Sequence, residues 1–184
     1  SGNTRVGDTV VVFGAGGVGI NAVQGAAIAG AGRVIVVDAN PAKQAMAEAF
    51  GATDFLVGAA DPAGQVLELT GGRGADVVIE ATGNADVMAA AYAAARPAGR
   101  VVYVGVAPAT AVVALPAARL PREEKIITGS FYGGAVALRD LPPVVDLYRA
   151  GRLKLGELVG AGVPPGEIQP GFGKPGHAGR RGTD

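Results

Sequence analysis

A glycine-rich turn near the start of the chain constrains its fold more than any other feature. The apolar run from Thr9 to Phe13 leads directly into Gly14-Ala15-Gly16-Gly17-Val18-Gly19, which has the spacing Gly-x-Gly-x-x-Gly, and helix-forming residues follow. In such a unit Gly14 permits the tight turn out of the strand, and Gly16 lets the backbone approach a pyrophosphate. Gly19 lets the helix pack closely on the sheet. The order of strand, glycines and helix predicts a dinucleotide-binding unit.

The acid that ends the next apolar run indicates which dinucleotide the unit would bind. Residues 33–37 lead into Asp38, which lies 19 residues beyond Gly19, close to the expected offset of roughly 20 residues. A carboxylate at this strand tip can accept hydrogen bonds from both ribose hydroxyls and would repel a 2′-phosphate. The sequence therefore predicts NAD, and not NADP, as the cofactor. Glycines also serve ordinary turns, so the interpretation depends on strand, glycines, helix, second strand and acid all occurring in the expected order and spacing.

Short apolar runs and helical patterns continue to alternate along the chain. Strands are predicted near 10–14, 33–38, 53–57, 76–80, 100–105 and 125–131, with helices near 18–30, 41–50, 62–70, 85–96 and 140–150. Several strands are apolar without alternation, as parallel strands covered on both faces are. The pattern predicts an α/β fold, a doubly wound, six-stranded parallel sheet of order 3-2-1-4-5-6 (a Rossmann fold). We expect this domain over 1–160 and an irregular tail over 161–184.

The second predicted helix has clear signals at both ends. Asn40 can cap its start, Pro41 suits its first position, and Gly51 can end it in a left-handed conformation. Apolar residues recur at helical spacing and predict one core-facing side that includes Met46 and Phe50; this side comprises Ala42, Ala45, Met46, Ala49 and Phe50.

Small residues gather where the later strands end. Gly83, Gly105 and Gly133 follow the fourth, fifth and sixth predicted strands. Ligands of open α/β sheets bind outside the carboxyl ends of the strands, so these glycines favour a trough for a flat cofactor. Each glycine taken singly fits an ordinary turn equally well.

Composition excludes several other classes of function. The chain has 49% hydrophobic and 17% charged residues, with a formal net charge of zero. There is no basic patch for nucleic acid, no basic amphipathic helix for a membrane surface, and no signal-peptide pattern. The absence of cysteine excludes a thiolate zinc site within the chain, so no metal ligand is predicted. These features predict a cytoplasmic domain without a membrane or nucleic-acid partner.

Seven segments together resemble the cofactor-binding domain of the zinc-dependent, medium-chain alcohol dehydrogenases. The similarity follows that family's order and spacing from about Gly7 to Ile168. The segments are 7–19, 37–43 (Val-Asp-Ala-Asn-Pro-Ala-Lys), 50–53, 74–83 (Gly-Ala-Asp-Val-Val-Ile-Glu-Ala-Thr-Gly), 99–106, 129–134 (Gly-Ser-Phe-Tyr-Gly-Gly) and 147–153.

The resemblance implies roles for individual residues and for the whole protein. It implies that Asp38 and Lys43 hold the adenosine ribose and that the pyrophosphate lies at the glycine turn. The full set of expected cofactor-binding residues is Gly14, Gly16, Gly17, Val18, Gly19, Asp38, Lys43, Thr82, Gly83, Val104, Gly105, Val106, Ser130 and Tyr132. Within this set, Thr82 and Gly83 would lie along the cofactor. Val104, Val106 and the backbone at Ser130 and Tyr132 would surround the nicotinamide. The parent enzyme would interconvert an alcohol and an aldehyde or ketone, with its zinc in a separate, absent domain.

The chain also departs from the family pattern. Ala135 and Val136 stand where the family usually has a basic residue after Gly133-Gly134. Residues 161–184 contain eleven glycines and prolines in 24 positions, too many for the family's closing helix and strand. Arg180 or Arg181 could replace the family's phosphate-binding arginine, but neither lies at the position that the family's spacing gives this arginine. No catalytic residue is therefore predicted, and the fragment should be inactive alone.

Two other classes of dehydrogenase fit the sequence less well. A short-chain dehydrogenase needs a tyrosine with a lysine four residues later, and none of the four tyrosines has one. A 2-hydroxy-acid dehydrogenase needs a histidine base, and the single histidine, His177, lies in the Gly/Pro-rich tail. The open alternative is a non-enzymatic NAD-binding sensor or regulatory module.

The predicted sixth strand suggests a homodimer. It ends the sheet, and the apolar segment 111–115 precedes it. An exposed strand edge invites pairing with another chain, most often by twofold symmetry. Pro116, Pro121 and the charged residues 122–124 could blunt this edge, but the apolar residues favour a dimer.

Overall fold

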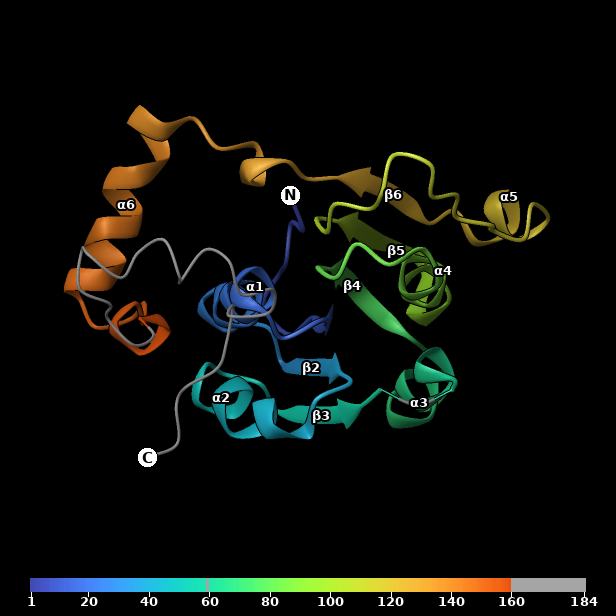
Figure 1. Cartoon of the computed structure of the whole chain (residues 1–184), viewed down its shortest axis with the longest axis horizontal. Coiled ribbons are helices and arrows are strands. Elements are labelled where there is room, and N and C mark those ends of the chain that lie inside the picture. The colour runs from blue at the N-terminus through green and yellow to red at the C-terminus, as the bar shows by residue number, and fades with distance from the viewer. Residues whose placement is uncertain (59, 160–184) are drawn as a thin grey trace, which may run out of the picture. The chain divides into compact units, whose positions relative to one another are not determined.

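Six parallel strands form a single sheet in the order β3-β2-β1-β4-β5-β6, which confirms the predicted fold class (Figure 1). The structure, a computed structural model, describes residues 1–58 and 60–159. It falls into two compact units, of which the first spans Ser1–Val136 and contains the whole sheet. The predicted tail over 161–184, with His177, Arg180 and Arg181, lies outside the described residues, so the boundary near 160 stays a prediction.

Most elements begin and end within a few residues of their predicted bounds. In the first unit the order is β1 (Thr9–Phe13), α1 (Gly17–Ile28), β2 (Arg33–Asp38), the 3-10 turn η1 (Pro41–Lys43), α2 (Gln44–Ala49), β3 (Asp54–Val57), α3 (Pro62–Leu69), β4 (Ala75–Glu80), α4 (Ala85–Ala94), β5 (Ala95–Tyr103), α5 (Arg119–Glu123), β6 (Ile126–Gly129) and η2 (Tyr132–Gly134). The second unit holds α6 (Ala137–Arg149) and η3 (Gly156–Leu158). The short helix α5 was not predicted, and β6 is shorter than expected.

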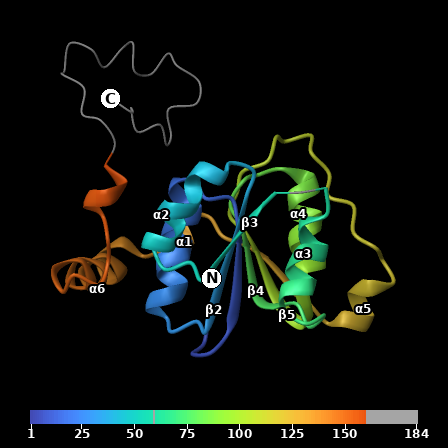
Figure 2. The same cartoon turned by 90° about the horizontal axis from the view of Figure 1, so that it is seen from below.

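The core lies on both faces of the central strands. Helices α1 and α2 cover one face of the sheet and α3 and α4 cover the other (Figure 2). Because both faces are covered, Val10, Val11 and Val12 of β1 are all fully buried, as are Val34, Ile35 and Val36 of β2 to within 1%. This is the physical reason that these strands lack alternation of polar and apolar residues.

The strand register brings the carboxyl ends of five strands to one edge. Phe13 of β1 pairs with both Val37 of β2 and Glu80 of β4, and Glu80 is in turn aligned with Tyr103 of β5. Tyr103 is aligned with Gly129 of β6. The loops that follow these strands therefore emerge side by side.

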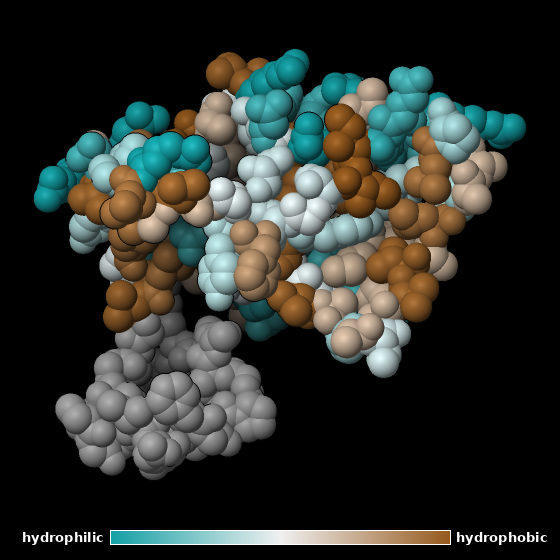
Figure 3. Space-filling view, turned by 90° about the horizontal axis from the view of Figure 1, so that it is seen from above, coloured by the Kyte–Doolittle hydropathy of each residue, from teal (hydrophilic) through white to brown (hydrophobic). Residues whose placement is uncertain are grey.

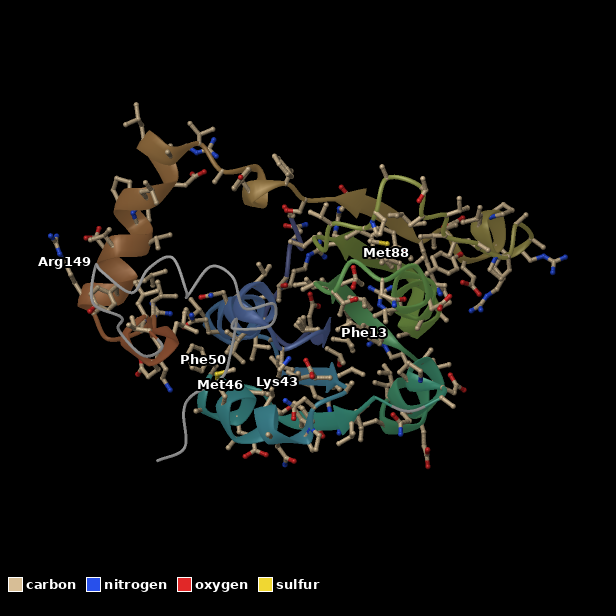
Figure 4. The ribbon with its side chains drawn as sticks, viewed as in Figure 1. Phe13, Lys43, Met46, Phe50, Met88 and Arg149 are labelled. Atoms are coloured by element: carbon tan, nitrogen blue, oxygen red, sulfur yellow. The ribbon has the colours of Figure 1, made fainter. Side chains whose placement is uncertain are left out.

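The end signals of the second helix are confirmed, but its apolar side is partly wrong. The Asn40 side chain accepts a hydrogen bond from the N–H of Ala42, and Gly51 has a φ of +107°. Phe50 is 3% exposed and lies between α1 and α2, where Met46 is only half-buried (Figure 4). Ala42, Ala45 and Ala49 are exposed, and Ala47 is buried instead. Residues 41–43 form a 3-10 turn, and the α-helix begins only at Gln44. Because a 3-10 turn has fewer residues per turn than an α-helix, α-helical spacing counted from residue 42 predicts the wrong buried residues.

Asp76 joins the amino-terminal ends of β1, β4 and β5. Its carboxylate accepts hydrogen bonds from Arg73 and Arg96 at 2.6 Å each and from the N–H of Thr9 at 2.9 Å. Burial opposes ionisation, but the guanidinium of Arg73 above all holds the pKa of Asp76 well below its usual value. The bond to Arg96 holds the first part of β5 against β4. In this part Ala98 has a φ of +55°, and the pairing of β5 with β4 shifts register.

Two charged residues before β6, Glu123 and Lys125, turn inward, whereas Arg122 and Glu124 remain exposed. The Lys125 side chain is 1% exposed, and its Nζ lies 2.8 Å from Glu123 and 4.4 Å from the centre of the Tyr92 ring. Burial lowers the pKa of Lys125, although the pairing with Glu123 opposes this. On β6 itself, Ile126 and Ile127 remain 47% and 39% exposed. Strand β6 itself is therefore apolar, with Glu123 and Lys125 paired beside it and Arg122 and Glu124 exposed in the segment before it.

Candidate functional site

The turn after β1 is tight and lies against α1, as the glycines at positions 14 and 19 predicted. Gly14 has a φ of +92°, and its N–H donates to the Val37 carbonyl at 2.8 Å. A Cβ at Gly14 would lie 2.7 Å from the Thr82 Cγ2, and a Cβ at Gly19 would lie 1.7 Å from the Gly14 carbonyl oxygen. Both positions therefore require glycine, the first because of its φ and the second because α1 packs directly on the turn.

The amino-terminal end of α1 is open on the side of this turn. Gly16 is the N-cap and makes no side-chain capping hydrogen bond, and the first turn holds no acidic residue. A Cβ at Gly16 or Gly17 would meet nothing within 4 Å, and Val18 is 58% exposed. Uncapped N–H groups and the positive end of the helix dipole make such an end a suitable site for an anion, a phosphate group above all.

Asp38 connects the tip of β2 to the glycine turn. Its Oδ2 accepts hydrogen bonds from the N–H of Ala15 at 2.7 Å and from Lys43 Nζ at 2.9 Å, and its Oδ1 accepts one from the N–H of Asn40. Lys43 lies between the start of α2 and β2 (Figure 4). Burial opposes ionisation of Asp38, but the donors, first Ala15 and then Lys43, outweigh it and lower the pKa of the carboxyl. A negative charge therefore stands beside the uncapped start of α1.

The loop after β4 is organised by an acid that sequence reasoning passed over as a site residue. Glu80 is fully buried, and its Oε1 accepts hydrogen bonds from the N–H and hydroxyl of Thr82 and from the N–H of Gly83. Thr82 itself is exposed beside Gly14. The available signal was the acid at the end of the apolar run Val77–Ile79, because such a strand end is covered on both faces and a carboxyl there needs nearby donors.

The loops after β4 and β5 interlock through two glycines. Gly83 has a φ of +75°, and a Cβ there would lie 2.5 Å from the Val106 carbonyl oxygen. A Cβ at Gly105 would lie 2.1 Å from the Gly83 nitrogen. Val104 is half-buried, whereas Val106 is 82% exposed. The backbone there is too close for any side chain, so the loops form one continuous surface.

The end of β6 continues this edge. The N–H of Ser130 donates to the Tyr103 carbonyl at 2.9 Å, and its hydroxyl lies 2.8 Å from that of Ser1. Tyr132 is 84% exposed, has a φ of +50° and packs edge-on against Phe131 at 4.6 Å between ring centres. The structure thus brings the fourteen predicted site residues to the carboxyl edge of the sheet or to the helical turns that follow it.

Over residues 1–58 and 60–159, no three or more His, Cys, Asp or Glu side chains are grouped so that they could hold a metal ion. In the same ranges, no helix has both the length and the apolar character needed to cross a membrane.

A parallel sheet of this order with a glycine turn at the first strand defines a Rossmann-type dinucleotide-binding fold. Within that class the chain belongs to the zinc-binding dehydrogenase family, whose model matches residues 17–150. It is 44% identical over 162 residues to a putative alcohol dehydrogenase D of Mycobacterium tuberculosis, covering 86% of this chain and 44% of that protein. It is 40% identical over 172 residues to alcohol dehydrogenase 3 of Hordeum vulgare, covering 91% and 45%.

Solved structures give the same result. The crystal structure of an alcohol dehydrogenase zinc-binding domain protein from Burkholderia ambifaria superposes with a TM-score of 0.86 at 31% identity, covering 92% of this chain and 45% of that one. The chain therefore spans less than half the length of these relatives, over the part that carries the parallel sheet.

Proposed function

We propose that this chain is the NAD(H)-binding domain of a zinc-dependent alcohol dehydrogenase. The observation that carries the proposal is the joining of Asp38 to the N–H of Ala15, which holds an acid beside the uncapped start of α1. A phosphate-binding helix end and a ribose-binding carboxylate are the two parts that a dinucleotide requires.

The acceptor capacity of Asp38 fits a ribose diol. A carboxylate has about four lone-pair sites, and three hydrogen bonds to Asp38 occur in the structure. One site remains, and a second would open if Lys43 turned from Asp38 to a ribose hydroxyl. A 2′-phosphate would instead bring a second negative charge against this carboxylate, which supports a preference for NAD(H) over NADP(H).

The rest of the cofactor would follow the carboxyl edge. We infer that Gly17 and Val18 contact the pyrophosphate and that Thr82 and Gly83 contact the middle of the cofactor. Val104, Val106, Ser130 and Tyr132 would then surround the nicotinamide. The open backbone at Gly16 and Gly17 and the close packing of Gly83 on Gly105 support these placements.

The chemistry of the whole enzyme is proposed from its relatives. The two relatives named above are described as alcohol dehydrogenases, so we propose interconversion of an alcohol and an aldehyde or ketone. Zinc in the parent enzyme would polarise the substrate oxygen and lower the hydroxyl pKa. The residues of this chain would bind and orient the cofactor for hydride transfer.

A titration with NADH, followed by its fluorescence, tests the binding role directly. We expect saturable binding of NADH and weaker binding of NADPH. Equal or tighter binding of NADPH would contradict the proposed role of Asp38. No binding of either would contradict the proposal as a whole.

An activity assay tests whether the catalytic groups lie outside this chain. Because the chain contains no cysteine, we expect no turnover of alcohols by it even with added zinc. Zinc-dependent turnover that a chelator abolishes would show that the catalytic groups lie within this chain.

We also propose that β6 pairs the domain with a second copy. Figure 3 views the molecule from the β6 side of Figure 1 and shows apolar residues spread over this surface. Val112, Ile126 and Ile127 are among the exposed apolar residues near the edge. An exposed parallel edge with apolar neighbours supports edge-to-edge association.

A further inference from the structure

The structure assigns Glu80 the role of a positioning residue, which fixes the loop between β4 and α4 in the conformation that would contact NAD(H). This inference deepens the proposed function and depends on it. Glu80 has no exposed surface, so it acts on the cofactor only through the groups that it holds.

The Glu80 side chain holds the first half of the loop. Its Oε1 accepts from the N–H of Thr82 at 2.6 Å, from the Thr82 hydroxyl and from the N–H of Gly83 at 3.0 Å, while Oε2 lies 3.3 Å from the same Gly83 N–H. These donors come from residues two and three positions further along the chain. The carboxyl thus closes a tight turn that leaves Gly83 with a φ of +75°.

The Thr82 hydroxyl carries the network into the next helix. It donates to Glu80 and also accepts a hydrogen bond from the N–H of Asn84 at 3.1 Å. The Asn84 side chain in turn accepts from the N–H groups of Asp86 and Val87 and caps α4. One buried carboxyl therefore determines the path of the chain from the end of β4 to the start of α4.

The Glu80 backbone holds the neighbouring loop. Its carbonyl oxygen accepts hydrogen bonds from the N–H groups of Val104 at 2.8 Å and Gly105 at 3.0 Å. These residues begin the loop that interlocks with Gly83. Glu80 thus contacts both loops that form the middle of the candidate site. Its side chain holds Thr82 and Gly83 in the conformation that places Thr82 beside Gly14.

The buried carboxyl of Glu80 serves to accept hydrogen bonds from the loop and does not only fill space in the core. No lysine or arginine of the described part of the chain forms an ion pair with it, so N–H and O–H donors supply its hydrogen bonds. An apolar residue of similar size would leave the N–H groups of Thr82 and Gly83 without these bonds, and the N–H of Gly83 would be a buried unpaired donor. Buried polar networks of this kind, when satisfied, impose one conformation.

The test compares Glu80→Gln with Val66→Ala in the 184-residue chain. Glutamine keeps the size but places an amino group where one of the two acceptor oxygens stands, so it meets the N–H of Gly83 or of Thr82 as a second donor. We expect the Kd for NADH to rise about tenfold or more and amide exchange at Thr82 and Gly83 to quicken about tenfold. Val66 is fully buried in α3, and its truncation supplies a comparable loss of stability without touching the loop.

A second pair of variants keeps the test informative if Glu80→Gln folds poorly. Thr82→Val removes the hydroxyl that bonds Glu80 and Asn84 and should quicken amide exchange at Gly83 and Asn84, whereas Thr82→Ser keeps the hydroxyl and should retain the exchange rates of the unmodified chain. NADH binding by Glu80→Gln within about twofold of the unmodified chain would overturn the inference. So would equal weakening by Val66→Ala at the same melting temperature.

The two proposals fail in distinguishable ways. If the unmodified chain binds no NADH, the proposed function is wrong, and the exchange rates of Thr82 and Gly83 still show whether Glu80 holds the loop. If the unmodified chain binds NADH and Glu80→Gln leaves both binding and exchange unchanged, only the role of Glu80 is wrong.

Discussion

Replacing Asp38 by asparagine should weaken NADH binding and reduce the discrimination against NADPH. The substitution keeps the shape of the side chain but exchanges one acceptor oxygen for a donor. In one orientation the new amino group faces Lys43 and the N–H of Ala15; in the other it faces the N–H of Asn40. Either orientation places the amino group against at least one donor where the native carboxylate has an acceptor.

The magnitude follows from the burial of these groups. The Asp38 side chain is only 9% exposed, so water replaces few of the lost hydrogen bonds. Loss of a charged acceptor for the ribose hydroxyls costs about 1–3 kcal/mol, which corresponds to a rise of roughly 5-fold to 150-fold in the Kd for NADH. The loss of a negative charge also removes repulsion of a 2′-phosphate, so NADPH binding should weaken less or improve.

Paired titrations with NADH and NADPH measure both effects. We expect the ratio of the NADPH Kd to the NADH Kd to fall by about tenfold in Asp38→Asn, the equivalent of about 1.4 kcal/mol. Glu48→Gln serves as the control, since Glu48 is an exposed acid on α2 whose side chain bonds only Gln44 among the described hydrogen bonds. A ratio in Asp38→Asn that equals that of the unmodified chain would refute the reasoning.

Three further predictions concern the fold and its assembly. Gly19→Ala should lower the free energy of unfolding by about 3 kcal/mol or more, because its Cβ would lie 1.7 Å from a backbone oxygen of Gly14. Gly25→Ala on the same helix, with nothing within 4 Å, should raise it by about 0.5–1 kcal/mol; equal effects in urea unfolding would contradict this. The lowered pKa of Asp76 stabilises the fold above the unfolded value near 4 and loses this effect as the pH falls. Asp76→Asn should therefore cost about 1–3 kcal/mol at pH 7, with the difference from the unmodified chain shrinking below pH 4 in acid unfolding; a constant difference would disprove the linkage. Val112→Glu, at a position 82% exposed, should shift a dimer towards monomer in light scattering without loss of NADH binding, whereas a monomeric unmodified chain would exclude the dimer.

The sequence by itself determined the sheet, and it predicted where the candidate site lies. Uniformly apolar strands are typical of a parallel sheet with both faces covered, and this, with the alternation of strands and helices, predicted the strand order that the structure confirms. The spacing of Gly14, Gly19 and Asp38 reflects local geometry, since a turn, a helix contact and a strand tip are each fixed within a few residues of the chain. Local chemistry of this kind can be inferred from residue types alone.

Tertiary structure alone decided what the buried charged and polar groups do. Sequence reasoning treated Glu80 as part of a strand end and Glu123 as a residue that could blunt the sheet edge. In the fold, Glu80 accepts hydrogen bonds from the following loop, and Glu123 pairs with Lys125 beneath Tyr92. The hydrogen-bond partners of Glu80 and Glu123 lie within four residues of them in sequence. The burial of these groups comes from elements distant in sequence, as with Tyr92 against Lys125, so their role depends on packing that only the tertiary structure fixes.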